Sequence, residues 1–160
     1  LDEIPVDAAR YFFNSTADTQ MDFDMDLAVR QDSENPVYYV QYAHARICTM
    51  IANLAADGVN VPAAAEADLS LLDSAEEVAL IKQLSLLPEE VRLAARDYNP
   101  SRINAYVTEL AARFHRFYTA SRIKGAEEEL AKARLLLAEC TRQVIENSLD
   151  IVGVTAPEKM

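Results

Sequence analysis

The chain has 160 residues, of which 51% are hydrophobic and 26% are charged. This composition suits one compact globular domain and excludes an intrinsically disordered chain. The apolar runs are too short to cross a bilayer as a helix, and the sequence carries no basic-then-apolar leader typical of secretion. Cys48 and Cys140 each fall within a helical pattern; a disulfide is possible, but two reduced thiols in the core are favoured. We therefore expect a cytoplasmic protein that does not bind membranes.

The net charge of −11 argues at first against a nucleic-acid partner. The charge is unevenly distributed, however. Residues 1–91 carry a net charge of −13, residues 92–142 carry +4, and residues 143–160 carry −2. A local basic face attracts phosphates even on an acidic protein, so an RNA partner stays open.

The first 34 residues combine a short helical pattern with an alternating one. Residues 6–13 (VDAARYFF) predict a helix with Asp7 near its positive end. Residues 21–28 (MDFDMDLA) alternate apolar and acidic side chains, which predicts a strand or an extended segment. A polar connector at residues 32–35 then marks a boundary between two regions.

From Pro36 onward, the apolar period changes to that of helices. Pro36 with Asn35 as its cap predicts a helix that ends near Gly58. Ser74 and Glu77 form the pattern of a capping box, which opens a helix that restarts near Pro88 and runs to Tyr98. Two long helices follow, over about 101–123 and 127–152. Five or so helices with short connections predict an all-α fold, an antiparallel helical bundle.

Motifs for catalysis and metal binding are missing from the sequence. There is no glycine-rich phosphate loop, and His44 and His115 have no Cys or His at metal-ligand spacing. The run Asp22-x-Asp24-x-Asp26 begins like a calcium loop but lacks the later Gly and Glu. We expect no catalytic residues and no metal site, and therefore a binding module.

Three stretches of the chain resemble arginyl-tRNA synthetases. Residues 35–46 (NPVYYVQYAHAR) are similar to the segment that enters the C-terminal helical domain of that family. Residues 99–123 resemble its helix with a His-x-Phe-Tyr pattern, and the ending GVTAPEKM is similar to its Gly-x-x-Ala-Pro-Glu-x-Met ending. The runs DAARYFF and MDFDMDLA agree with the region that precedes the helical domain, whereas residues 60–90 support the resemblance only loosely.

The resemblance implies a division of the chain and a function. Residues 1–34 would be a remnant following the catalytic domain, and residues 35–160 would be the helical anticodon-binding domain of a class I synthetase that ends naturally at Met160. The implied partner is the anticodon stem-loop of an arginine tRNA. We expect no binding to DNA, and we expect the protein to be a monomer. The full enzyme would join arginine to this tRNA using ATP with magnesium. The present fragment, which starts without Met, would carry no cofactor and be inactive alone.

The resemblance also assigns candidate binding residues by motif. The anticodon-binding candidates are Tyr39, Tyr42, Arg46, Tyr118, Arg122 and Met160. The first three are spaced three and four apart, so one helix face presents two rings and a cation. Unstacked RNA bases gain about 1–3 kcal/mol each by stacking on aromatic rings. In some relatives an aromatic residue stands in place of Arg122. Weaker candidates, for phosphate contacts, are Arg102, Arg113, Arg116, Lys124 and Arg142.

Each of these residues also has a plain structural interpretation. The tyrosines can pack with their rings inside and hydroxyls at the edge, the basic residues can be solvated surface charges, and Met160 can be a frayed end. For both histidines, a packed or supporting role is favoured. Two other hypotheses stay open: an acidic helical module that binds proteins, and the same domain from another class I synthetase. Convergence of the tyrosines and the basic residues on one face would favour RNA.

Overall fold

The computed structural model describes residues 4–16 and 22–160 of the chain. Within these ranges the protein is helical and has no strand, which confirms the predicted all-α class. The α-helices are α1 (Val6–Ser15), α2 (Met25–Val29), α3 (Pro36–Ala56), α4 (Ala75–Ser85), α5 (Leu87–Asp97), α6 (Ser101–Ala120) and α7 (Glu128–Ile151). Two short 3-10 helices, η1 (Ala64–Glu66) and η2 (Leu69–Leu71), connect α3 to α4. No helix of the described ranges is long and apolar enough to span a membrane.

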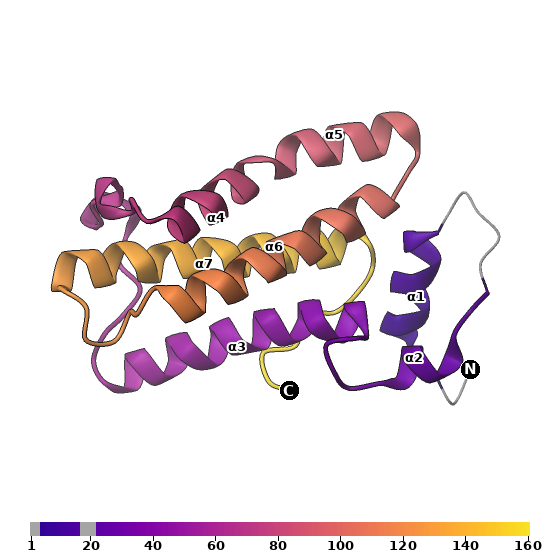
Figure 1. Cartoon of the computed structure of the whole chain (residues 1–160), viewed down its shortest axis with the longest axis horizontal. Coiled ribbons are helices and arrows are strands. Elements are labelled where there is room, and N and C mark those ends of the chain that lie inside the picture. The colour runs from indigo at the N-terminus through magenta and orange to yellow at the C-terminus, as the bar shows by residue number, and fades with distance from the viewer. Residues whose placement is uncertain (1–3, 17–21) are drawn as a thin grey trace.

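The long helices form a bundle of four parts, namely α3, the consecutive pair α4–α5, α6 and α7. The helices α3 and α6 run in one direction, while α7 and the pair α4–α5 run in the other (Figure 1). Parts of the bundle that follow one another along the chain are therefore antiparallel, as predicted. The small helices α1 and α2 lie at the end of the bundle where α3 begins (Figure 1).

Local signals in the sequence set the ends of α3 and α7. The Asn35 side chain accepts a hydrogen bond from the backbone N–H of Val37 at 3.2 Å, and Pro36 occupies the first turn. Gly58 ends α3 with a φ of 84°, a left-handed conformation that glycine adopts without strain. Gly153 ends α7 in the same way with a φ of 71°. These predicted boundaries are confirmed.

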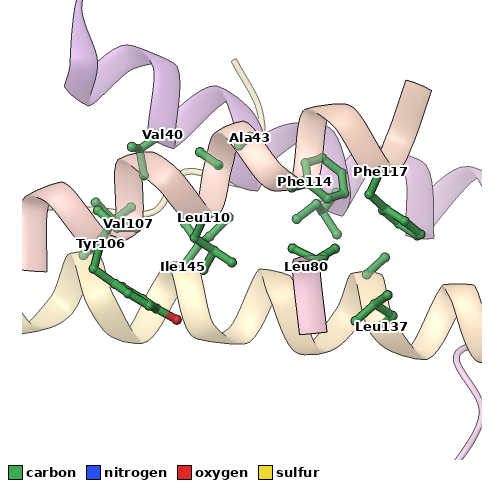
Figure 2. Packing of buried hydrophobic residues seen from close by; sticks show 14 of the residues in the cluster. Val40, Ala43, Leu80, Tyr106, Val107, Leu110, Phe114, Phe117, Leu137 and Ile145 are labelled. Carbon is green, nitrogen blue, oxygen red and sulfur yellow. The ribbon is translucent and has the colours of Figure 1, made fainter. Parts of the chain in front are cut away.

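The core lies between α3, α6 and α7, and Leu80 of α4 completes it (Figure 2). On α6, Val107, Leu110 and Phe114 recur at three- and four-residue spacing and are fully buried. Val40 of α3 and Ile145 of α7 belong to the same buried cluster and lie on either side of α6 (Figure 2). The same spacing places His115 and Tyr118 on the neighbouring face of α6, toward α3.

A buried ion pair connects α4 to α7. The Glu77 carboxylate is fully buried; it closes the predicted capping box with Ser74 and accepts a hydrogen bond from Arg134 Nε at 2.6 Å. Burial pushes the pKa of Glu77 upward, but the hydrogen bonds from Arg134 and Ser74 together outweigh it and lower the pKa. Arg134 also donates to the carbonyl of Arg122 at 2.7 Å, so the pair fixes the end of α6 as well.

The helix α1 packs onto α6 through both apolar and polar contacts. Tyr11 is buried and donates to the carbonyl of Asn104 at 3.1 Å, while the Asn104 amide donates back to the carbonyl of Tyr11 at 2.7 Å. Burial raises the pKa of Tyr11 to about 12, so its hydroxyl stays protonated at neutral pH. The described part of residues 1–34 is therefore anchored to the bundle, whereas the proposed domain boundary stays a prediction.

Two expectations from the sequence are wrong. A strand or an extended segment was predicted over residues 21–28, but the chain forms the helix α2 from Met25 onward, because the Asp24 side chain caps this helix by accepting from Leu27 N–H at 2.9 Å. Met21 lies outside the described residues. We also expected both cysteines to lie in the core. Both are unpaired thiols, but Cys140 is exposed on α7.

Candidate nucleic-acid interface

A hollow of about 420 Å³ opens between the start of α3 and the middle of α6. Its lining consists of Ser33, Tyr38, Tyr39, Tyr42, Arg46 and His115. Four of these six residues come from α3, where spacings of three, four and seven place them along one side of the helix. The hollow is thus lined almost entirely by rings, with one cation at its edge.

The rings in this hollow stack on one another. Tyr38 and Tyr42 are nearly parallel, with centroids 6.3 Å apart and an interplanar angle of 8°. His115 of α6 lies 5.0 Å from the ring of Tyr39 and 6.0 Å from that of Tyr42. Tyr42 remains 41% exposed, so its ring is available to a further planar group. The hollow therefore has an aromatic floor and an open aromatic rim.

Arg46 joins the aromatic residues of the two helices. Its guanidinium carbon lies 4.2 Å from the ring centroid of Tyr118 on α6 and 5.9 Å from that of Tyr42. A guanidinium at these distances is attracted to the faces of both rings. Among the described residues, no carboxylate forms an ion pair with Arg46. The cation is held in place and still available to an anionic or carbonyl group of a ligand.

Two further hollows continue along the same groove. One, of about 190 Å³, is lined by residues that include Tyr42, Arg46, Tyr118 and Met160. The next, of about 390 Å³, lies at the far end of α3 and α6 and includes Tyr118 and Arg122 in its lining. Neighbouring hollows share Tyr42, Arg46 or Tyr118, so they form one continuous track, which we call the α3–α6 track. All six predicted anticodon-binding residues line it.

His115 has an unusual environment at the floor of the first hollow. Burial lowers its pKa, and the nearby Arg46 cation lowers it further. Its Nε2 atom is buried and has no hydrogen-bond partner among the described residues. The imidazole is therefore neutral at pH 7 and adds a fourth ring to those of Tyr38, Tyr39 and Tyr42 in this hollow.

The predicted phosphate contacts fall into two groups. Four of them pair with carboxylates of the protein, namely Arg102 with Glu90, Arg113 with Glu109, Lys124 with Asp57, and Arg142 with both Glu139 and Glu146. Arg116 has no such ion pair among the described residues and lies beside Tyr39 and His115 in a side hollow. Convergence of positive charge on the aromatic face is thus limited to Arg46, Arg116, Arg122 and Lys124. The phosphate roles stay predictions.

The sequence interpretation missed several residues of the track. Tyr38 was not singled out, although its spacing of four from Tyr42 places both rings on one face. Met50 and Asn53 continue the same face of α3 beyond Arg46 and line the later hollows. The helical period could have identified all three. Within the described parts of the chain, no three His, Cys, Asp or Glu side chains converge to hold a metal ion.

Comparison with known proteins identifies the family of this chain. Residues 40–160, which include almost all of the α3–α6 track, match the model of the DALR anticodon-binding domain. The chain belongs to the DALR anticodon-binding domain family. The match begins inside α3 and extends to Met160, so the DALR domain contains the bundle and the C-terminal segment.

Relatives of this DALR domain occur in arginine–tRNA ligases. The chain is 52% identical over 161 aligned positions to the arginine–tRNA ligase of Ruminiclostridium cellulolyticum and 51% identical to that of Acetivibrio thermocellus. Each match covers the whole chain but only 28% of the relative, so the chain spans little more than a quarter of their length. A solved structure of Thermus thermophilus arginyl-tRNA synthetase aligns with a TM-score of 0.83 at 29% identity, over 96% of this chain and 26% of that one.

Proposed function

We propose that this DALR domain binds the anticodon stem-loop of an arginine tRNA through the α3–α6 track. One observation carries the proposal: Tyr39, Tyr42, Tyr118 and His115 line a groove in which Arg46 lies between the rings of the two helices. The family indicates that the ligand is a tRNA anticodon, and the names of the relatives indicate that this tRNA carries arginine.

The track suits unpaired bases better than a double helix. Bases in a loop lose their neighbours when they are splayed out, and they recover stacking on aromatic side chains. Tyr42 offers an exposed ring above the floor of the first hollow, and Tyr39 lies partly buried beside it. Arg46 can donate to a base edge or a phosphate while its flat guanidinium stays between two rings. Recognition then combines stacking, which accepts any base, with hydrogen bonds from Arg46, which discriminate between bases.

The first test is a fluorescence titration of the chain with an arginine anticodon stem-loop at low salt. A second loop that differs only in its middle base measures specificity. We expect tighter binding to the arginine loop and a loss of about 1–3 kcal/mol of binding free energy in Tyr42→Ala, the size of one stacking contact. Arg46→Ala should weaken binding and reduce the difference between the two loops.

Matched controls separate the site from general effects. Tyr98→Ala removes an exposed tyrosine at the end of α5, away from the track, and Arg92→Ala removes an exposed arginine of the same helix. Both should bind RNA like the wild type. Equal binding of the two loops, or no binding by a folded chain, would contradict anticodon reading. Absence of binding would favour the alternative, an acidic helical module that binds another protein, whereas equal binding would mean that the chain binds RNA without reading the anticodon.

The chain would act as part of a longer enzyme. We propose that this enzyme is a cytoplasmic arginine–tRNA ligase that uses ATP with magnesium to attach arginine, and that the present chain supplies tRNA binding without binding DNA or ATP itself. The support is the set of relatives, of which the chain covers 28%. The purified chain should be monomeric in sedimentation experiments and should not arginylate tRNA. Arginylation by the chain alone would contradict this division of labour.

A further inference from the structure

The C-terminal segment, residues 153–160, is folded back against α3. We call it the C-terminal strap. At the end of α7 the turn at Gly153 places the N–H of Val154 2.9 Å from the carbonyl of Leu149. The strap then crosses behind α3 (Figure 1). It ends at Met160, which lines the α3–α6 track beside Tyr118.

Two buried polar side chains of α3 hold the strap. Gln41 Nε2 donates to the carbonyl of Thr155 at 2.9 Å and to Asp7 Oδ2 of α1 at 2.8 Å. The same Asp7 oxygen accepts from the Thr155 hydroxyl at 2.5 Å. His44 Nδ1 lies 3.0 Å from the carbonyl of Pro157. A carbonyl oxygen only accepts, so Nδ1 carries the proton and donates.

The position of these contacts limits where Met160 can go. Met160 lies three positions after Pro157, and even a fully extended chain spans only about 10 Å over three residues. Fixing the Pro157 carbonyl on His44 therefore restricts Met160 to a short arc around the edge of α3. Tyr42 directly follows Gln41 and Arg46 comes two residues after His44, and both lie on the adjoining face of the same helix. One helix thus presents the ligand-facing rings on one side and the strap anchors on the other.

We propose that Gln41 and His44 are positioning residues for RNA binding: they touch no RNA, but they place Met160 in the α3–α6 track by holding the strap. The proposal rests on the proposed function for the statement that the track binds RNA. It explains why residues 41–44 (Gln-Tyr-Ala-His) include two polar residues that do not face the track, since only Tyr42 of this run lines it. Both anchors are almost completely buried, His44 at 1% and Gln41 at 9% exposure. Their hydrogen bonds are therefore shielded from competing water.

The first experiment needs no RNA. In the wild-type chain labelled with ¹³C-methyl methionine, the Met160 methyl resonance, assigned by its loss in Met160→Leu, should be shifted by the neighbouring Tyr42 and Tyr118 rings. In His44→Leu, which removes the donor, this resonance should move to the position of a free methionine. His44→Asn places an amide donor near the former Nδ1 and should restore the shift. Leu80→Val, which weakens the core away from the strap, should leave it unchanged.

The second experiment is a double-mutant cycle with the arginine anticodon stem-loop. His44→Leu should weaken binding on the order of tenfold, the effect of one good interface contact. In a Met160→Ala background, the same substitution should have little further effect, because the residue it positions is already gone.

The two experiments distinguish the failure of each idea. An unchanged Met160 methyl resonance in His44→Leu, or losses of affinity that add independently in the cycle, would overturn the positioning role while leaving RNA binding intact. A wild-type chain that does not bind the loop would overturn the proposed function. In that case the methyl resonance alone decides whether His44 holds the strap.

Discussion

Tyr98 ends α5 in a conformation that side chains other than glycine rarely adopt. Its φ is 51°, the sole positive value at a non-glycine residue in the described chain, and the side chain is 90% exposed. A left-handed conformation costs a non-glycine residue about 1–2 kcal/mol. Almost no packing of the tyrosine offsets this cost, so strain is stored at the turn between α5 and α6.

Tyr98→Gly should therefore stabilise the chain. Relief of the strain exceeds the greater unfolded-state entropy of glycine, about 0.5–1 kcal/mol, so we expect a net gain of about 0.5–1 kcal/mol in the free energy of unfolding. Urea denaturation monitored by circular dichroism measures it. The matched control is Ala95→Gly, at an exposed position within α5, which should destabilise by a similar amount. A loss of stability in Tyr98→Gly would show that its ring makes a contact that matters.

His115 makes the stability of the track depend on pH. Its pKa in the folded chain lies below the ordinary value of about 6.5, because burial and the Arg46 cation both disfavour the charged imidazole. The unfolded chain therefore binds more protons in the window just below pH 6.5, and the folded chain loses stability as the pH falls through it. In His115→Phe, unfolding free energies measured between pH 7.5 and about 5.5 should show a flatter slope. An unchanged slope would assign the effect to other groups.

At the scale of helices, local signals in the sequence were sufficient wherever one residue decides the structure. Asn35 with Pro36, the Ser74–Glu77 box, and Gly153 each fixed a helix end, because each satisfies backbone groups within a few residues. The prediction made from the run MDFDMDLA was wrong because four alternating positions also fit one helical turn. The Asp24 cap decided between them, and Phe23 packs on Phe12 and Phe13 of α1. Contacts of that kind cannot be read from a short periodic pattern.

Among the ion pairs of the described residues, the one between Glu77 of α4 and Arg134 of α7 is the most buried. Arg134→Met should destabilise the chain by about 3–5 kcal/mol, because it leaves the Glu77 carboxylate buried without its partner. Urea denaturation measures this loss, and Arg96→Met, which removes an exposed arginine paired with Asp97, should change stability by less than about 0.5 kcal/mol. Adding Glu77→Gln to Arg134→Met should recover part of the loss. Equal effects of the two arginine substitutions would contradict a special role for burial.

At the scale of the whole molecule, the candidate site could be predicted only in part. The family motif gave all six candidates that line the track, whereas the helical period accounted only for Tyr39, Tyr42 and Arg46, which share one helix face. The contacts that complete the site connect α3 to α6 and to the strap, at sequence separations of more than 60 residues, and periodicity carries no information about them. The anchoring of the strap by His44 was outside the reach of sequence reasoning for the same reason.

The distribution of charge gives the last prediction. A protein that neutralises one phosphate of single-stranded RNA loses affinity with salt at a slope of about 0.7 in log–log units. Arg116 and Arg122 line the track or its side hollow without an ion pair among the described residues, so we expect Arg116→Ala and Arg122→Ala each to reduce the slope by about that amount. Arg142 is held by Glu139 and Glu146, which raise its pKa, and its exchange for alanine should leave the slope nearly unchanged. Titrations of the anticodon stem-loop at several salt concentrations measure all three slopes. Equal reductions for Arg116, Arg122 and Arg142 would mean that phosphates compete successfully with the protein's own carboxylates, and that the basic face of the domain extends beyond the α3–α6 track.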